Sequence, residues 1–96
     1  GDKKKFNQPV LVTIYKDTQI KKLGFITQTD LRHLNLEDHV AVYIPHSYAF
    51  SGMLYIVPTE HVTLLDANST DVMKMIVSGG ISVKAAKEEN NGEHES

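Results

Sequence analysis

The sequence contains no cysteine and no tryptophan among its 96 residues. Without cysteine the chain forms no disulfide, offers no thiolate to a metal and has no cysteine nucleophile. It also contains no run of about 18 apolar residues, so no stretch of this chain predicts a transmembrane helix. These absences exclude thiol chemistry and leave the apolar side chains to stabilise the fold.

Neither sign of charge is in large excess. The formal net charge is −2, which is too small to predict a nucleic-acid-binding protein. The charges are unevenly distributed, because the first 22 residues hold six lysines and only two aspartates. Hydrophobic residues make up 41% of the chain and charged residues 23%, a balance that favours folding over disorder. The length fits one small domain with a modest core, so we do not expect a deep cofactor cavity.

Runs of apolar and β-branched residues predict a fold made mostly of strands. The strands are expected at residues 9–15, 20–27, 40–44, 53–57 and 61–65, and residues 81–83 could add a sixth. Gly24 lies inside the second strand and predicts a bulge or the close approach of another backbone. The third and fourth strands are nearly continuous apolar runs, which favours burial of both their faces.

One helix is predicted at about residues 69–78. Asn68 is a suitable N-cap, and the negative charge of Asp71 suits the first turn. Gly79 is expected to end the helix in a left-handed conformation. Three apolar residues at helical spacing are expected to share its packing face: Val72, Met75 and Ile76.

These elements predict an α+β domain that is mostly β. We expect a small antiparallel sheet or partial barrel of five to six strands, with one C-terminal helix packed on it. Residues 1–8 are interpreted as a basic lead-in, 9–83 as a single β-rich domain and 84–96 as a disordered polar tail. The predicted core includes residues from both central strands and the helix: Val42, Ile44, Leu54, Ile56, Val72 and Ile76.

Motifs for catalysis or metal binding are scarce. The five histidines are scattered, and no two have the spacing that is typical of zinc sites. No G-x-S-x-G nucleophile elbow occurs, and the acids Glu37 and Asp38 show no sequence sign of converging with others. Residues 78–80 (SGG) follow the helix, which favours a helix end over a phosphate-binding loop. No catalytic residue, cofactor or metal site is therefore predicted.

Two segments are candidates for binding. The loop after the third strand carries two aromatic residues among small polar ones; its ends are fixed by strands and its middle is expected to be free. We interpret it as a contact surface whose candidate residues are His46, Ser47, Tyr48, Phe50 and Ser51. The alternative is that Phe50 lies beneath the sheet.

The second candidate is the cluster Lys3, Lys4 and Lys5. A charge run at a terminus is most often a solvated segment. Its functional interpretation is contact with anionic lipid headgroups, which attract basic segments beside a membrane.

Five stretches, in this order and spacing, resemble the domain-of-unknown-function 502 family, which includes the plant continuous vascular ring (COV-like) proteins. They are 10–12 (VLV), 23–27 (LGFIT), 42–45 (VYIP), 51–58 (SGMLYIVP) and 78–80 (SGG), and the resemblance extends over about residues 3 to 83. Two segments depart from the family pattern. The loop before Ser51 lacks the family's threonines and prolines, and Thr59-Glu60-His61 replaces Arg-Glu-Asp.

The resemblance implies a parent protein with two N-terminal transmembrane helices followed by this soluble domain. The cluster at Lys3–Lys5 would then lie near the bilayer, and the positive-inside rule favours the cytoplasmic side. The family has no catalytic residues that could be assigned to this chain.

We therefore expect a non-enzymatic accessory domain of a membrane protein. It would act by self-association or by contact with a protein partner of unknown identity, and not with nucleic acid. The alternatives are a small hydrolase that uses histidine and carboxylates, and a sensor of a ligand or lipid at the membrane surface. A cleft of converging titratable groups would favour the hydrolase, whereas an exposed aromatic loop on the same face as Lys3–Lys5 would favour contact with a membrane or a partner.

Overall fold

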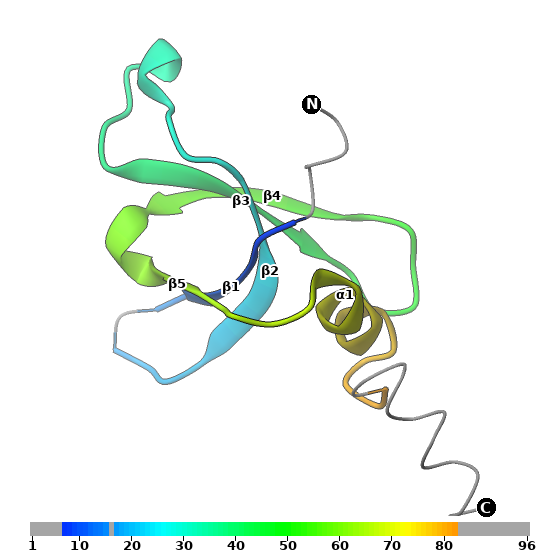
Figure 1. Ribbon diagram of the computed structural model, residues 1–96. Helices are drawn as coiled ribbons and strands as arrows, with labels where there is room; N and C mark the ends of the chain where they lie inside the picture. The colour runs from blue at the N-terminus through cyan, green and yellow to red at the C-terminus, as the bar shows by residue number, and fades with distance from the viewer. Residues whose placement is uncertain (1–6, 16, 83–96) are drawn as a thin grey trace, which may run out of the picture.

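A computed structural model describes residues 7–15 and 17–82. Along the chain follow β1 (Pro9–Thr13), β2 (Lys21–Gln28), the 3₁₀ turn η2 (Arg32–Leu34), β3 (His39–Pro45), β4 (Gly52–Pro58), the 3₁₀ turn η3 (Thr59–His61), β5 (Val62–Leu64) and α1 (Ser69–Val77) (Figure 1). The strands form one antiparallel sheet, which confirms the predicted α+β class with mostly β structure. The candidate residues Lys3–Lys5 and the predicted tail at 84–96 lie outside the described residues.

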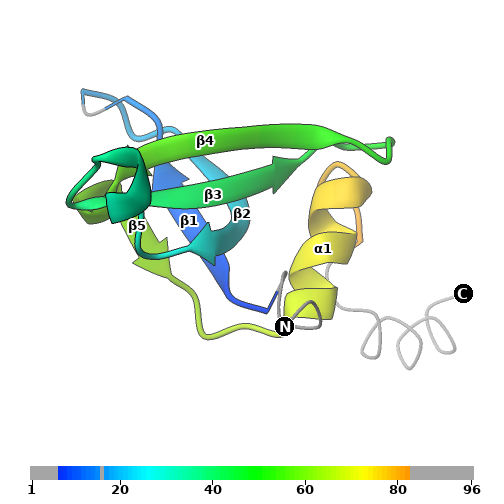
Figure 2. The same cartoon turned by 90° about the horizontal axis from the view of Figure 1, so that it is seen from above.

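The sheet has the strand order β4-β3-β2-β1-β5. β1 pairs with β2, β2 with β3 and β3 with β4, whereas β5 returns to pair with β1. Two strands that follow each other in sequence, β4 and β5, therefore form the two opposite edges of the sheet. The short turn η3 carries the chain from one edge toward the other, and the sheet curves strongly between them (Figure 2).

Apolar residues are buried on both faces of this curved sheet. One face encloses the larger cluster, which consists of Val10, Val12, Val40, Val42 and Ile44. On the other face α1 packs its Val72 and Ile76 against Phe25, which has no exposed surface. Figure 2 shows α1 beside the sheet. Since successive residues of a strand point to opposite faces, β2 contributes to both clusters.

Four of the six predicted core residues are buried, and two predictions are wrong. Leu54 is 62% exposed and Ile56 is 39% exposed. Both lie on β4, which is an edge strand and has a neighbour on one side only. Tyr55 and Val57 point to the opposite face, where they pack against the larger cluster. The apolar run at 53–57 is therefore covered on one face at Tyr55 and Val57 and open on the other at Leu54 and Ile56.

The helix begins and ends largely as its sequence predicts. The Oδ1 atom of Asn68 accepts a hydrogen bond of 3.0 Å from the backbone N–H of Asp71, so Asn68 is the N-cap. Gly79 has φ +71°, which confirms the left-handed C-terminal residue. The predicted packing of Met75 is wrong, because Met75 is exposed and Met73 packs beside the Phe25 cluster instead.

The close approach predicted at Gly24 is confirmed. A Cβ atom on Gly24 would lie 2.7 Å from the carbonyl oxygen of Tyr43 on the neighbouring strand, so only glycine fits. The irregularity in this strand pair lies further along, between Ile26 and Gln28. Residues 81 and 82 are not in a strand, and Val83 lies outside the described residues.

Candidate functional site

The loop that joins β3 to β4 turns down to the C-terminal end of α1 (Figure 1). His46 and Ser51 close its base, because the His46 N–H donates to the Ser51 carbonyl over 2.8 Å. The His46 Nδ1 atom also lies 3.0 Å from the Ser51 Oγ atom. The predicted loop residues are therefore brought together, but they perform different tasks.

Ser47 and Tyr48 bind the end of the helix. The Ser47 hydroxyl donates to the Ile76 carbonyl over 2.7 Å, and the Tyr48 N–H donates to the Val77 carbonyl over 2.8 Å. The Tyr48 hydroxyl reaches the Ser78 carbonyl over 2.7 Å. The last carbonyls of a helix lack partners within it, and the loop supplies those partners here. The middle of the loop is consequently anchored, which corrects the expectation that it is free.

The helix end also shows why residues 79 and 80 are glycines. The Gly79 N–H donates to the Ile76 carbonyl and the Gly80 N–H to the Met75 carbonyl, which together form a Schellman motif. A Cβ atom on Gly79 would lie 3.0 Å from the Tyr48 ring. Tyr48 itself has φ +56°, an uncommon conformation for a bulky residue that the three loop–helix hydrogen bonds hold in place.

The aromatic side chains of the loop are exposed, which is the arrangement that the contact-surface interpretation needs. Phe50 is fully exposed, so the alternative in which it lies beneath the sheet is wrong. Tyr48 is 72% exposed even though its hydroxyl is hydrogen-bonded. The loop is therefore a supported platform, fixed by Ser47 and Tyr48, that presents Phe50 to solvent.

Beyond this platform, β4 continues the exposed apolar surface along the edge of the sheet. We call the group formed by Phe50, Met53, Leu54 and Ile56 the apolar edge; all four side chains are exposed. No charged residue occurs between His46 and Glu60 in the sequence. Sequence reasoning placed the last two of these residues in the core and did not single out Met53, because a half-covered edge strand and a buried strand carry the same apolar run.

The backbone of β4 is open along the same edge. The ladder between β3 and β4 is bracketed by two hydrogen bonds, from Thr59 N–H to the Asp38 carbonyl and from His46 N–H to the Ser51 carbonyl. Antiparallel pairs alternate between hydrogen-bonded and non-hydrogen-bonded residues. It follows that Gly52, Leu54 and Ile56 point their N–H and C=O groups away from β3.

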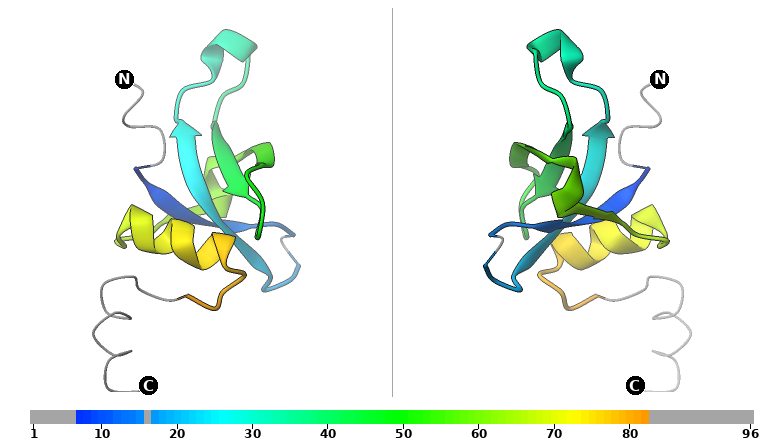
Figure 3. Two further views of the ribbon diagram at one scale, coloured as in Figure 1. Left: turned by 90° about the vertical axis from the view of Figure 1, so that its right-hand side faces the viewer. Right: turned by 90° about the vertical axis from the view of Figure 1, so that its left-hand side faces the viewer.

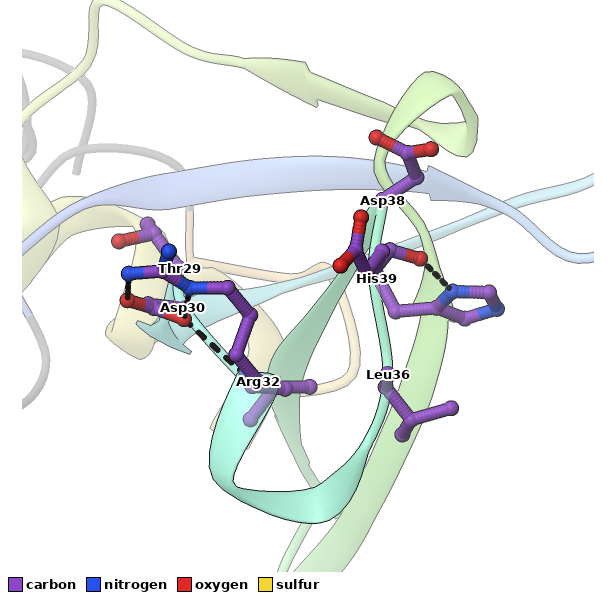
Figure 4. Close-up of a pocket in the computed structure, with 8 residues that line it drawn as sticks. Thr29, Asp30, Arg32, Leu36, Asp38 and His39 are labelled. Atoms are coloured by element: carbon purple, nitrogen blue, oxygen red, sulfur yellow. Dashed lines mark hydrogen bonds and ion pairs between the residues drawn. The ribbon is translucent and has the colours of Figure 1, made fainter.

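A separate polar depression of about 350 Å³ lies beside the connection between β2 and β3. This connection extends away from the body of the sheet (Figure 3). Asp30 accepts hydrogen bonds from the Arg32 Nε atom over 3.0 Å and from its Nη2 atom over 2.7 Å (Figure 4). The Arg32 guanidinium therefore lowers the pKa of the Asp30 carboxyl, and the pKa of Arg32 rises in turn. Both side chains are exposed, which makes the pair a local support of the turn.

The other titratable groups of this depression do not converge on a common point. The His39 Nδ1 atom donates to the Glu37 carbonyl over 2.8 Å, and its ring lies on the opposite side from the Asp30–Arg32 pair (Figure 4). Within residues 7–15 and 17–82, no three histidine or acidic side chains are close enough to hold a metal ion.

The contact between His46 and Ser51 has the atoms of a base and a nucleophile. Such a pair normally needs a third group that orients the imidazole. In the described part of the chain, no carboxylate is hydrogen-bonded to His46. The exposed apolar edge is therefore the more distinctive feature of this hairpin.

Comparison with protein families identifies one match. The family described as "Protein of unknown function (DUF502)" matches residues 1–52, which include β1 to β3 and the helix-binding loop. No curated protein and no solved structure matches the chain. Among the described residues, α1 is too short to cross a bilayer and no other helix is long and apolar enough to do so. Because the match extends over more than half of the sequence, the chain belongs to the DUF502 family of proteins of unknown function.

Proposed function

We propose that this domain is a non-enzymatic contact module of a membrane-anchored protein, and that it binds protein through the apolar edge. The observation that carries the proposal is the exposure of Phe50, Met53, Leu54 and Ile56 along an uncharged strand with open backbone groups. Large exposed apolar groups gain free energy when a partner removes them from water.

β4 lacks the features that usually keep an edge strand from pairing with another chain, and this supports the proposal. Natural edge strands are usually kept short or carry charges, bulges or prolines that prevent pairing with other chains. β4 is seven residues long and has no charged side chain; its one proline, Pro58, stands at its end. The other edge, β5, is only three residues long. The β5 edge is therefore too short to pair extensively with another chain, whereas the β4 edge is available for contact.

The platform formed by the loop gives the contact surface a fixed shape. Three hydrogen bonds from Ser47 and Tyr48 to the end of α1 hold the loop, so the backbone beside Phe50 is already positioned before a partner binds. Preorganisation of this kind reduces the entropy lost on association.

Family membership supports the membrane anchor. The resemblance implies two transmembrane helices before this domain, and the cluster Lys3–Lys5 suits a position on the cytoplasmic side of a bilayer. Tethering to a membrane raises the effective concentration of neighbouring proteins, so a small surface such as the apolar edge is enough for assembly.

Photo-crosslinking of the full-length protein in cells tests this function. A photoreactive amino acid replaces Leu54 on the apolar edge or, as a matched control, Leu64 on β5; the two leucines are 62% and 63% exposed. We expect protein adducts at position 54 in clear excess over position 64. Equal yields at the two positions, or adducts with lipid alone at position 54, would contradict a protein-contact role.

A further inference from the structure

We infer that the apolar edge binds a second copy of the same chain, with β4 paired antiparallel to β4 about a twofold axis. This inference rests on the proposed contact function and specifies its partner. The two five-stranded sheets would then join into one continuous sheet, which is how an exposed edge strand most directly satisfies its open backbone groups.

The open backbone groups of β4 are self-complementary. Gly52, Leu54 and Ile56 each offer an outward N–H and C=O group, and Pro58 offers only its carbonyl because proline has no N–H. An antiparallel partner must therefore present an acceptor opposite each of the three donors, and needs no acceptor opposite Pro58.

The length of β4 selects the register. The strand runs from Gly52 to Pro58, so Tyr55 is its midpoint, and pairing centred on Tyr55 overlaps the two strands over their whole length. Leu54 then lies opposite Ile56 of the second copy, and these residues exchange both of their backbone hydrogen bonds. Gly52 lies opposite Pro58 of the second copy, whose carbonyl accepts the Gly52 N–H. All three outward donors find acceptors in this register.

The side chains fit the same register. Leu54 and Ile56 are the exposed residues on one face of β4, and the register places them directly opposite each other across the axis. Met53 comes opposite Val57 on the other face. Because β4 carries no charge, two copies bring no like charges together along the strand.

The other edge of the sheet is a poorer partner. β5 has only three residues, so a β4–β5 contact would leave most of the outward groups of β4 unpaired. A β4–β4 contact is the arrangement that uses the full length of both strands. Among the edges of the described residues, β4 itself is therefore the best match for β4.

The first test compares Leu54→Asp with Leu64→Asp by sedimentation equilibrium over a wide range of protein concentration. We expect the unmodified chain and Leu64→Asp to form dimers, and Leu54→Asp to dissociate about tenfold more readily or worse, because its carboxylate would be desolvated in the contact. A chain that stays monomeric at every concentration, or equal dimerisation of the two variants, would overturn the inference.

The second test measures the register by disulfide trapping. These 96 residues include no cysteine, so a single Tyr55→Cys substitution in this chain gives an unambiguous product. In the proposed register the two copies of position 55 form a non-hydrogen-bonded pair with Cα atoms about 4.5 Å apart, within the range that disulfides span. We expect oxidation to yield dimers of Tyr55→Cys but not of the control Thr63→Cys at the midpoint of β5. Equal yields would overturn the inference.

The two proposals fail in different ways. If position 54 crosslinks to another protein while Leu54→Asp sediments like Leu64→Asp, self-pairing is wrong and the contact function stands. If position 54 gives no excess of protein adducts over position 64, the contact function fails as well.

Discussion

The neighbouring strands β3 and β4 have almost the same composition and opposite surroundings. Residues 40–44 (VAVYI) and 53–57 (MLYIV) are both apolar runs, and they pair with each other residue by residue. Yet Ala41 on β3 is 4% exposed, whereas Ile56, its cross-strand partner on the same face of β4, is 39% exposed. The difference arises from strand order, because β3 lies between two neighbours and β4 has only one.

This comparison shows that an apolar strand need not belong to the core of its own chain. Burial of β3 stabilises the domain itself. Burial of the exposed side chains of β4 against another chain would stabilise that contact through the same hydrophobic effect. A strand that looks like core in the sequence and lies at an open edge in the structure is therefore a candidate interface.

The largest expected loss of stability is in β3, and it distinguishes the buried strand β3 from the edge strand β4. We expect Ile44→Ala to lower the free energy of unfolding by about 2–5 kcal/mol, because it leaves a cavity in the larger cluster. The same substitution at Ile56 should cost the monomer clearly less, since Ile56 is 39% exposed and has less apolar area to lose from the fold. Urea denaturation at low protein concentration measures both. Equal losses would mean that β4 is as much a part of the core as β3.

The next effect concerns the loop that joins the two strands. Gly79→Val places a β-branched residue at φ +71° and against the Tyr48 ring, so we expect a loss of about 1–3 kcal/mol. Gly80→Val is the matched control, because Gly80 also has positive φ but no atom within 4 Å of its Cβ position. The excess loss at Gly79 measures the Tyr48 contact. If the two variants lose the same stability in thermal unfolding, that contact does not support the loop.

A smaller difference in stability should distinguish Tyr48, which anchors the loop to α1, from Phe50, which is exposed to solvent. Tyr48→Phe removes the hydrogen bond to the Ser78 carbonyl and should cost about 0.5–1.5 kcal/mol. Phe50→Ala should change the stability of the monomer by no more than about 0.5 kcal/mol while weakening association, because its side chain is fully exposed. Denaturation and sedimentation of the two variants separate these roles. A large loss of stability in Phe50→Ala would make Phe50 a structural residue.

The smallest expected effect on stability comes from the ion pair of Asp30 and Arg32, in the connection between β2 and β3. Arg32 lowers the pKa of the Asp30 carboxyl below its ordinary value of 3.8, so the ion pair contributes to stability above that pH. The contribution is lost as the pH falls through the lowered pKa. An NMR titration of the carboxyl carbon should show the pKa of Asp30 returning toward its ordinary value in Arg32→Gln. An unchanged titration in that variant would show that the pair is not formed in solution.

The sequence predicts the local elements well because their signals are local. Asn68 and Gly79 mark the two ends of α1 through capping and left-handed geometry, and Gly24 marks the close approach of Tyr43. These signals depend on one residue and its nearest neighbours. The approximate positions of the strands follow from similar local patterns, whereas the sequence left open whether Phe50 is exposed or lies beneath the sheet.

The apolar edge could not be predicted in this way, because strand order is a non-local property. The runs at 40–44 and 53–57 do not reveal which one lies at the edge until β5 is known to pair with β1. The contacts of Ser47 and Tyr48 with α1 join residues about thirty positions apart, and no spacing rule connects them. The candidate loop was therefore found from its aromatic residues, whereas its anchoring and the adjoining edge required the structure.

Hydrogen exchange of three backbone amides tests the central claim most directly. Leu54 and Ile56 point their N–H groups out of the β4 edge, and Leu64 points its N–H group out of the β5 edge, since Leu65 donates to Pro9. If β4 pairs with a second copy, the amides of Leu54 and Ile56 exchange more slowly as protein concentration rises, while the amide of Leu64 stays unchanged. Rapid, concentration-independent exchange at Leu54 and Ile56 would contradict the account.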